Sequence, residues 1–393
     1  MKQYPVVAGA FCQTALGDLD LTWERLCRGD TALECHDFPS AGRWPVGVAV
    51  AADAPFGSAE RVRALVKETL APLLDGEFLL PEGTDLVVAT TKGAVDELSR
   101  DASPLDMACQ PWNLAGWIAE LLKISGRVST VSGACASGTI AIVQACQMIS
   151  SGSSGAVLVA GIDILSNFVQ SGFASLKALS GNSCHPFDSG RDGLAMGEAM
   201  GALLIVSDRC ASENRYEKLA VVSGMAVSCD AVHITAPCRK GSGLVRVLEG
   251  IFHDFPGKRP GAINAHGTGT RYNDAMELAA FTRFWEDGAP PVHSVKGSLG
   301  HCLGAAGVTE TAIALKSLHD GVIPPTYGFR QADAPFAGDV RISGSSCLKL
   351  EADSILSCNS GFGGINAGIL LEKTIERRPQ KLSQKKGPGS RNS

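Results

Sequence analysis

Residues 131–140 read VSGACASGTI and place Cys135 among small residues, directly before the apolar run 141–146. A second stretch of the same kind, SVKGSLGHCLGAAG at residues 294–307, also leads into a helical pattern. Gly-rich turns join buried strands to helices because glycine allows close backbone approach and positive φ. Strand, Gly-rich turn and helix, repeated in this order, predict an α/β fold.

The two stretches belong to a longer repeat. Short apolar runs at 85–90, 156–160, 203–206 and 369–371 are typical of buried strands. Gly201 follows Cys135 by 66 residues, and Ala367 follows His301 by the same interval, which favours a duplicated domain. A chain of 393 residues also exceeds the usual size of one core.

The polar stretch 207–218 is the candidate junction between the two halves. We therefore predict an N-terminal half at 1–210 that carries Cys135 and a C-terminal half at 211–373 that carries two histidines. Residues 374–393 are rich in Lys, Arg, Ser, Gly and Pro, which predicts a basic, disordered tail.

Composition excludes several classes of protein. A charged fraction of 19% and a net charge of -5 give no sign of disorder or of nucleic-acid binding. Thirteen cysteines without a C-x-x-C pair fit reduced thiols in a cytoplasmic protein better than disulfides or zinc. We expect no membrane span, because no apolar run reaches about 18 residues, and no signal peptide, because the first apolar run is short.

Cys135 has two interpretations. Most cysteines in apolar surroundings are inert core residues, but a thiol at a helix N-terminus gains partial positive charge and free backbone N–H groups. His266 follows the strand-like run 261–264 and His301 lies in the second Gly-rich turn. A cysteine and two histidines in such loops together favour a nucleophilic site.

Six segments in order resemble the signatures of the β-ketoacyl-acyl-carrier-protein synthases, the elongating Cys-His-His enzymes of the thiolase superfamily. They cover most of the chain from about residue 113 to 373 and read GACASG (133–138), HPFDSGRDGLAMGEAMGALLIV (185–206), DAVHITAP (230–237), NAHGTGTRYNDAMELAA (264–280), SVKGSLGHCLGAAGVTE (294–310) and NSGFGGINA (359–367). The resemblance implies the thiolase-like fold, with two duplicated halves in a five-layered α-β-α-β-α arrangement.

The resemblance also implies a reaction. Cys135 would take an acyl group from a carrier-protein or CoA thioester, and His266 and His301 would hydrogen-bond the carbonyl of the malonyl thioester as carbon dioxide leaves. The resulting carbanion would attack the acyl group on Cys135, in fatty-acid or polyketide synthesis. Oriented donors stabilise such an oxyanion strongly in a site poor in water.

Further roles follow residue by residue from the family motifs. The backbone N–H groups of Cys135 and Phe362 would form the oxyanion hole of the acylation step, and Lys296 would be the active-site lysine. We interpret Glu310 as the charged partner of Lys296, and Asp274 and Glu277 as orienting or structural groups. The residues that the resemblance places along the substrate are Thr268 and Thr270 for the pantetheine arm, Phe173 as a gate beside the acyl pocket, and His233 in the cavity wall.

The expected partners are an acyl carrier protein and a second subunit, either a copy of this chain or a chain-length-factor-like protein. No cofactor is expected beyond the phosphopantetheine that carries the substrates, and no metal. Three alternatives stay open at this point: a degradative thiolase, a non-elongating chain-length-factor-like subunit, and an initiating synthase that uses acyl-CoA. The Cys-His-His set argues against each of them.

Overall fold

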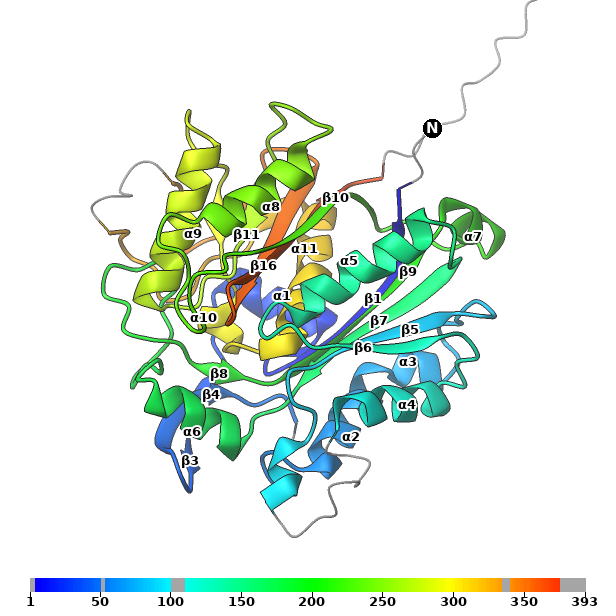
Figure 1. The fold of residues 1–393 in the computed structure, drawn as a ribbon, viewed down its shortest axis with the longest axis horizontal. Coiled ribbons are helices and arrows are strands. Elements are labelled where there is room, and N and C mark those ends of the chain that lie inside the picture. The colour runs from blue at the N-terminus through cyan, green and yellow to red at the C-terminus, as the bar shows by residue number, and fades with distance from the viewer. Residues whose placement is uncertain (1–3, 51–53, 100–109, 334–339, 375–393) are drawn as a thin grey trace, which may run out of the picture.

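The computed structural model describes residues 4–50, 54–99, 110–333 and 340–374. Its strands and helices stack as five layers, with two sheets separated by a pair of helices and covered by helices on their outer sides (Figure 1). This is the thiolase-like arrangement that the sequence predicts.

The two halves build their sheets in the same strand order. The first runs β1-β9-β7-β5-β6 and the second β10-β16-β15-β11-β12, and a short antiparallel contact between β1 and β10 joins them. The strands of the first sheet are β1 (Val6–Thr14), β5 (Asp85–Ala89), β6 (Val128–Val131), β7 (Ala156–Asp163) and β9 (Ala199–Val206). Those of the second are β10 (Ala220–Cys229), β11 (Ala262–Asn264), β12 (Val292–His293), β15 (Ser354–Gly361) and β16 (Ile365–Glu372).

The middle layer consists of α5 (Ser137–Ser150) and α11 (Ala306–Asp320). Both helices are apolar on nearly every side, because each faces a sheet above and below. Ile142 of α5 packs in one cluster with Leu203 of the first sheet and Ile369 of the second, and all three are buried. The core of the molecule is therefore shared by the two halves.

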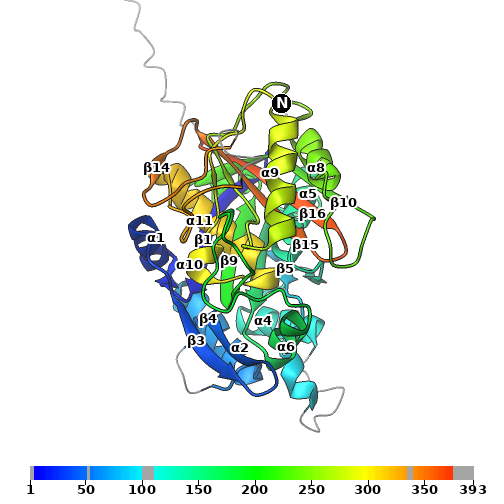
Figure 2. The same ribbon diagram turned by 90° about the vertical axis from the view of Figure 1, so that its left-hand side faces the viewer.

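The outer layers cover the remaining faces of the sheets. The first sheet is covered by α2 (Ala59–Thr69) and α4 (Pro111–Leu121), and the second by α8 (Ser242–Phe252) and α9 (Arg271–Phe284) (Figure 2). The sequences of α2 and α8 are amphipathic and fit this position, with one face buried and the other exposed.

The repeat seen in the sequence has a structural counterpart. Gly201 lies in β9 and Ala367 in β16, and these strands hold equivalent positions in the two sheets. Cys135 precedes α5 and His301 precedes α11, so the duplicated turns bring the two residues to corresponding helices. The domain boundaries stay a prediction; the connection between β9 and β10 contains α7 (Asp208–Glu213), and residues 375–393 of the predicted tail lie outside the described residues.

The remaining elements lie around this framework. They are β2 (Gly17–Asp18), α1 (Leu19–Arg28), β3 (Leu33–Phe38), β4 (Gly42–Gly47), α3 (Ala71–Leu74), η1 (Val95–Ser99), α6 (Asn167–Ser175), β8 (Met196–Gly197), α10 (Lys296–Leu299), η2 (Leu303–Ala305), β13 (Val322–Ile323) and β14 (Leu348–Lys349). Of these, α6, α10 and η2 bound the site described below.

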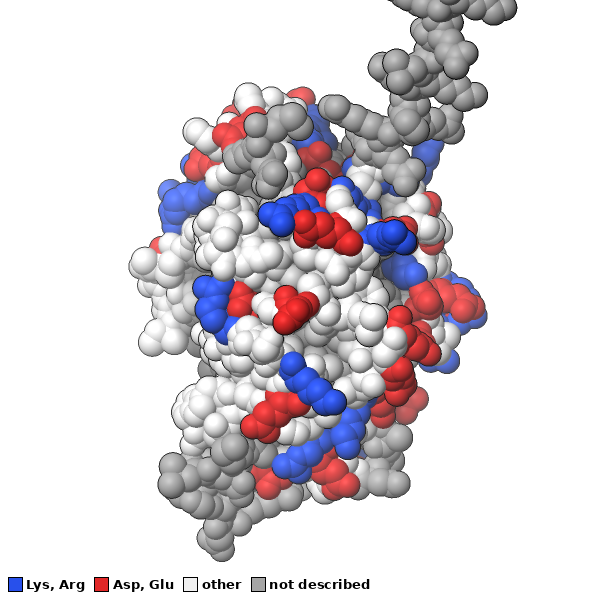
Figure 3. All heavy atoms as spheres, turned by 90° about the vertical axis from the view of Figure 1, so that its right-hand side faces the viewer, with Lys and Arg blue, Asp and Glu red and all other residues white. Residues whose placement is uncertain are grey.

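The face of the molecule in Figure 3 carries acidic and basic side chains interspersed around a largely uncharged area. This face offers no patch of a single charge sign to a polyanion. Among the described residues, no helix is both long enough and apolar enough to cross a membrane.

Candidate active site

Cys135 lies in the tight turn between β6 and α5. Ala134, just before it, has a left-handed φ of 50°, and the Ser137 hydroxyl accepts the backbone N–H of Gly133 at 2.8 Å. Ser137 in turn donates to the Ala134 carbonyl at 2.6 Å, which closes the turn. The thiol is thereby held at the N-terminal end of α5, where the partial positive charge of the helix dipole lies.

His266 follows β11, in a loop that is held by two buried carboxylates. Glu277 accepts the backbone N–H groups of His266 and Gly267, each at 2.7 Å. Asp274 accepts those of Thr268 at 3.0 Å and Gly269 at 3.1 Å. The structure places both carboxylates where an orienting role requires them, because each fixes the loop through its backbone.

His301 lies between α10 and η2. Its backbone N–H donates to Ala195 at 2.7 Å, and its carbonyl accepts the N–H of Gly197 at 3.0 Å. Residues from the first half thus fix the position of a histidine from the second half.

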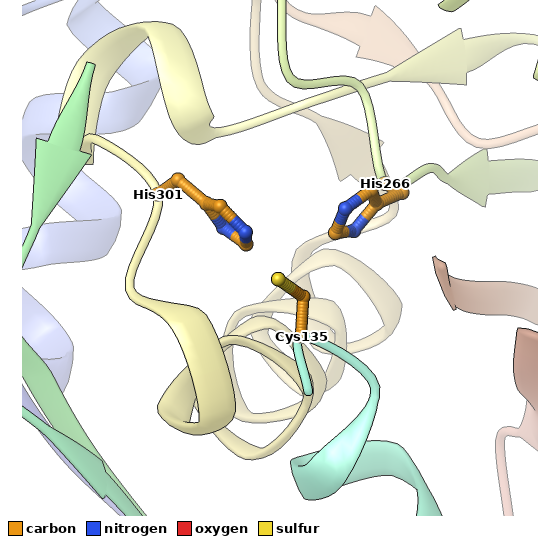
Figure 4. A group of neighbouring side chains, drawn as sticks. All are labelled: Cys135, His266 and His301. Atoms are coloured by element: carbon orange, nitrogen blue, oxygen red, sulfur yellow. The ribbon is translucent and has the colours of Figure 1, made fainter. Parts of the chain in front are cut away.

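The three side chains meet at one point (Figure 4). One donor atom from each of Cys135, His266 and His301 lies within 4.8 Å of the others. The imidazole rings stand edge to face, with centroids 5.1 Å apart and an interplanar angle of 87°. All three residues are buried, and the sulfur faces both rings, so that the three side chains form a triangle.

Burial controls the protonation of this group. Burial, and then the charge of Lys296, lower the pKa of His266 and His301 well below the ordinary value, so both imidazoles are neutral at pH 7. Burial raises the pKa of Cys135 to about 12, although Lys296 and the backbone N–H groups of Cys135 and Phe362 lower it. These two N–H groups are the ones that the sequence resemblance assigns to the oxyanion hole.

Lys296 lies close enough to both histidines for its charge to act on them, but it is not in the pocket wall. Its Nζ donates to Glu310 Oε1 at 2.5 Å, and both side chains are almost fully buried. The predicted partnership of these two residues is present in the structure. Lys296 is not among the residues that line the pocket, so it acts on the site through Glu310 and through its charge.

Asn359 is a site residue that the sequence reasoning missed. Its side-chain amide donates to Glu310 Oε2 at 2.8 Å and lies 3.3 Å from His266 Nδ1. The available signal was its position at the end of a buried strand, just before the GFGG turn.

Cys135, His266 and His301 line a pocket of about 500 Å³. Thr268, Thr270, Phe173 and Phe362 all line it, in agreement with the placement expected from the sequence. The expectation for His233 was wrong: it is exposed and absent from the wall. Its Nδ1 accepts the backbone N–H groups of Thr235 at 3.1 Å and Ala236 at 3.0 Å, so it shapes the turn that supplies wall residues.

Cysteine sulfur and imidazole nitrogen are also the donors that zinc prefers. Coordination needs an unprotonated ring nitrogen facing the metal. The Asn359 N–H beside His266 Nδ1 favours a proton on the opposite nitrogen, so this set suits hydrogen-bond donation better than metal binding.

Comparison with known proteins places this site in a family. The model of the β-ketoacyl synthase N-terminal domain matches residues 82–211, and that of the C-terminal domain matches residues 219–330. The chain belongs to the β-ketoacyl synthase family. Members of this family are condensing enzymes of the acyltransferase type, and Cys135 and both histidines lie within the matched residues.

Individual relatives agree with this β-ketoacyl synthase assignment. The chain is 32% identical over 309 residues to the 3-oxoacyl-[acyl-carrier-protein] synthase 2 of Vibrio harveyi, which covers 75% of this chain and 74% of the relative. Among solved structures, the ishigamide ketosynthase/chain length factor matches with a TM-score of 0.85 and 23% identity, over 95% of this chain and 100% of that one. The ketosynthase ApeO in complex with its chain length factor ApeC, from Xenorhabdus doucetiae, matches with a TM-score of 0.80 and 25% identity, over 95% and 98%.

Proposed function

We propose that this β-ketoacyl synthase condenses an acyl group held on Cys135 with malonyl-acyl-carrier protein, in fatty-acid or polyketide synthesis. One observation carries the proposal: the Cys135 sulfur faces two neutral imidazoles, with the three donor atoms within 4.8 Å of one another, in the wall of a pocket. A nucleophile beside oriented donors is what acyl transfer and enolate formation require.

In the first step, the Cys135 sulfur attacks the carbonyl carbon of an acyl thioester. A new carbon–sulfur bond forms to Cys135, the bond to the carrier sulfur breaks, and the thiol proton of Cys135 ends on the departing carrier thiol. The oxyanion of the intermediate would accept hydrogen bonds from the backbone N–H groups of Cys135 and Phe362, both of which lower the pKa of the Cys135 thiol. The high pKa of the buried thiol implies that the proton leaves as the new bond forms.

In the second step, malonyl-carrier protein replaces the first carrier. The carbon–carbon bond between the malonyl α-carbon and its carboxylate breaks, which releases carbon dioxide and leaves an enolate. The enolate oxygen accepts hydrogen bonds from His266 and His301. The enolate carbon attacks the acyl carbonyl on Cys135, the carbon–sulfur bond breaks, and the thiolate takes up one proton. Both imidazoles stay neutral because burial, and then the nearby charge of Lys296, oppose protonation, and a neutral imidazole still donates one ring N–H.

The pocket offers separate regions for the two parts of the substrate. Thr268 Oγ1 and Thr270 Oγ1 lie 3.0 Å apart in the wall, and their hydroxyls suit the amides of a pantetheine arm. Phe173 stacks on Phe362, with ring centroids 5.5 Å apart, and both rings also border a second groove along α6 of about 1180 Å³. That groove is mainly apolar and fits an acyl chain once the gate formed by the two rings opens.

An acyl carrier protein is the partner that would deliver both thioesters. Lys177 and Arg271 line the pocket, and Arg239 stacks over Tyr272, another wall residue, at 5.4 Å. Two cations against one acidic wall residue, Asp192, give the pocket a positive lining, although the chain as a whole is acidic. Local positive charge of this kind would guide an acidic carrier to the entrance.

We further propose a dimer in the cytoplasm. β6 ends the sheet order, and Val128 on it is 42% exposed, so its free edge is available for a second subunit. That subunit is a copy of this chain or a chain-length-factor-like protein. The free cysteines of the described residues suit a reducing compartment.

The test combines purified protein with acyl- and malonyl-carrier protein and measures β-ketoacyl product by mass. We expect a product two carbons longer than the primer. Acylation of Cys135 without condensation or decarboxylation, with every candidate partner subunit added, would contradict the proposal.

A further inference from the structure

Asn359 joins the buried Lys296–Glu310 ion pair to the active-site histidine. It belongs to β15, is fully buried, and lies at the meeting point of α5, α11 and the His266 loop. A buried amide in such a place has each of its polar atoms fixed by a neighbour.

The orientation of this amide follows from the groups on either side. Glu310 accepts a hydrogen bond from Lys296 at 2.5 Å through one oxygen, and the other oxygen lies 2.8 Å from Asn359 Nδ2. A carboxylate only accepts, so the atom facing it must be the amide nitrogen. On the opposite side, the Thr139 hydroxyl donates to Asn359 Oδ1 at 2.5 Å.

The same amide nitrogen lies 3.3 Å from His266 Nδ1. Because an amide nitrogen cannot accept, His266 Nδ1 must carry a lone pair, and the ring proton of the neutral imidazole lies on Nε2. We propose that Asn359 is a positioning residue that locks His266 in the Nε2–H tautomer and so makes it a hydrogen-bond donor to the substrate carbonyl. This inference rests on the proposed function.

Because Asn359 fixes the tautomer of only one of the two histidines, His266 and His301 differ in how they can hydrogen-bond. His301 Nδ1 has no hydrogen-bond partner among the described residues, so no comparable contact sets its tautomer. His266 is a fixed donor, whereas His301 is free to donate or to accept the thiol proton of Cys135. The Lys296–Glu310 pair acts by orienting Asn359.

The direct test is nuclear magnetic resonance of protein labelled with ¹⁵N-histidine, with the His266 signals assigned by their loss in His266→Gln. We expect wild-type His266 as the Nε2–H tautomer, and Asn359→Leu to produce a substantial Nδ1–H fraction. A wild-type His266 in the Nδ1–H form overturns the proposal, and so does an unchanged tautomer in folded Asn359→Leu.

A second variant covers the case in which Asn359→Leu does not fold. Glu310→Gln keeps the size of the side chain but replaces one of its two acceptor oxygens by an NH2 donor. The remaining oxygen is needed by the Lys296 ammonium, so the NH2 group faces Asn359, favours a flipped amide, and we expect Nδ1–H signal there too. Thr139→Val is the matched control, since it removes the hydrogen bond to the amide oxygen and leaves Glu310 in place. We expect it to keep the Nε2–H tautomer, and a shift in Thr139→Val would contradict orientation by Glu310.

Kinetics supply the independent readout. In a Cys135→Gln background, Asn359→Leu should slow malonyl decarboxylation by about a hundredfold, the usual effect of losing one oxyanion donor. In the Cys135 protein, the same change should alter thiol acylation less than about threefold. Equal losses in both steps would indicate a merely structural role and overturn the proposal. If wild-type protein decarboxylates no malonyl-carrier protein, the proposed function fails. The tautomer measurement still shows in that case whether Asn359 fixes the tautomer of His266.

Discussion

Asp163, at the end of β7, accepts the backbone N–H of Gly304 at 2.7 Å and thereby ties the first half to the turn that follows His301. The approach is close, because a Cβ on Gly304 would lie 2.8 Å from the Asp163 carboxylate. The same carboxylate pairs with buried Lys92 at 2.9 Å and accepts from Thr91. The position of His301 therefore depends on a charged group in the other half.

This relationship predicts a large effect on stability. Asp163→Ala leaves the Lys92 ammonium buried without its partner, and we expect a loss of about 3–5 kcal/mol in the free energy of unfolding. The double variant Lys92→Met, Asp163→Leu should recover part of that loss, because it removes both charges. Chemical denaturation measures both values, and a loss below about 1 kcal/mol in the single variant would show that the pair is not structural.

A second prediction concerns His293, whose buried ring nitrogens have no partner among the described residues. Burial, with Lys296, lowers the pKa of His293 to about 3. Below the ordinary pKa of 6.5, His293 binds a proton in the unfolded chain but stays neutral in the folded protein. The free energy of unfolding therefore decreases as the pH is lowered from about 6.5 to 3. His293→Gln should reduce the slope of unfolding free energy against pH by about 1.4 kcal/mol per unit in that range. His253→Gln, at an exposed histidine, is the control; equal slopes in wild type and His293→Gln would contradict the prediction.

The thiol of Cys135 gives a third prediction. Because its pKa is raised to about 12, the thiolate fraction in the free enzyme should rise about tenfold per pH unit from pH 7 to 10. Alkylation by iodoacetamide, followed by mass spectrometry of the Cys135 peptide, should show the same rise in rate. A plateau near pH 8 would instead mean that the thiolate is already formed in the resting protein.

A fourth prediction concerns the stacked rings of Phe173 and Phe362, which both border the thiol pocket and the groove along α6. Phe173→Ala removes one side of this gate, so acylation of Cys135 by long acyl chains should increase relative to short ones. Phe168→Ala is a suitable control, because Phe168 borders only the groove. The effect is measured as the ratio of kcat/KM for long acyl primers to kcat/KM for short ones. If this ratio is the same in Phe173→Ala and wild type, the two rings do not act as a gate.

The sequence predicted the fold, and it singled out Cys135, His266 and His301, which the structure brings together. Gly-rich turns before two apolar helices predicted where Cys135 and His301 lie, because a turn at the carboxyl end of a buried strand has few alternative positions. His233 and Asn359 were beyond this reasoning. His233 lies on an exposed turn whose direction depends on its own side-chain hydrogen bonds, and the contacts of Asn359 reach Thr139 and Glu310, which are distant in the chain. Such pairings depend on how layers pack, and local patterns do not encode them.

The central claim is that Cys135 carries the acyl chain while His266 and His301 promote loss of carbon dioxide. Cys135→Gln separates the two roles, and the measurement is carbon dioxide release and β-ketoacyl product from malonyl-carrier protein, with and without an acyl primer. We expect no condensation product, with decarboxylation equal to or faster than that of the wild type. Loss of both activities in a folded Cys135→Gln protein would contradict this division of labour.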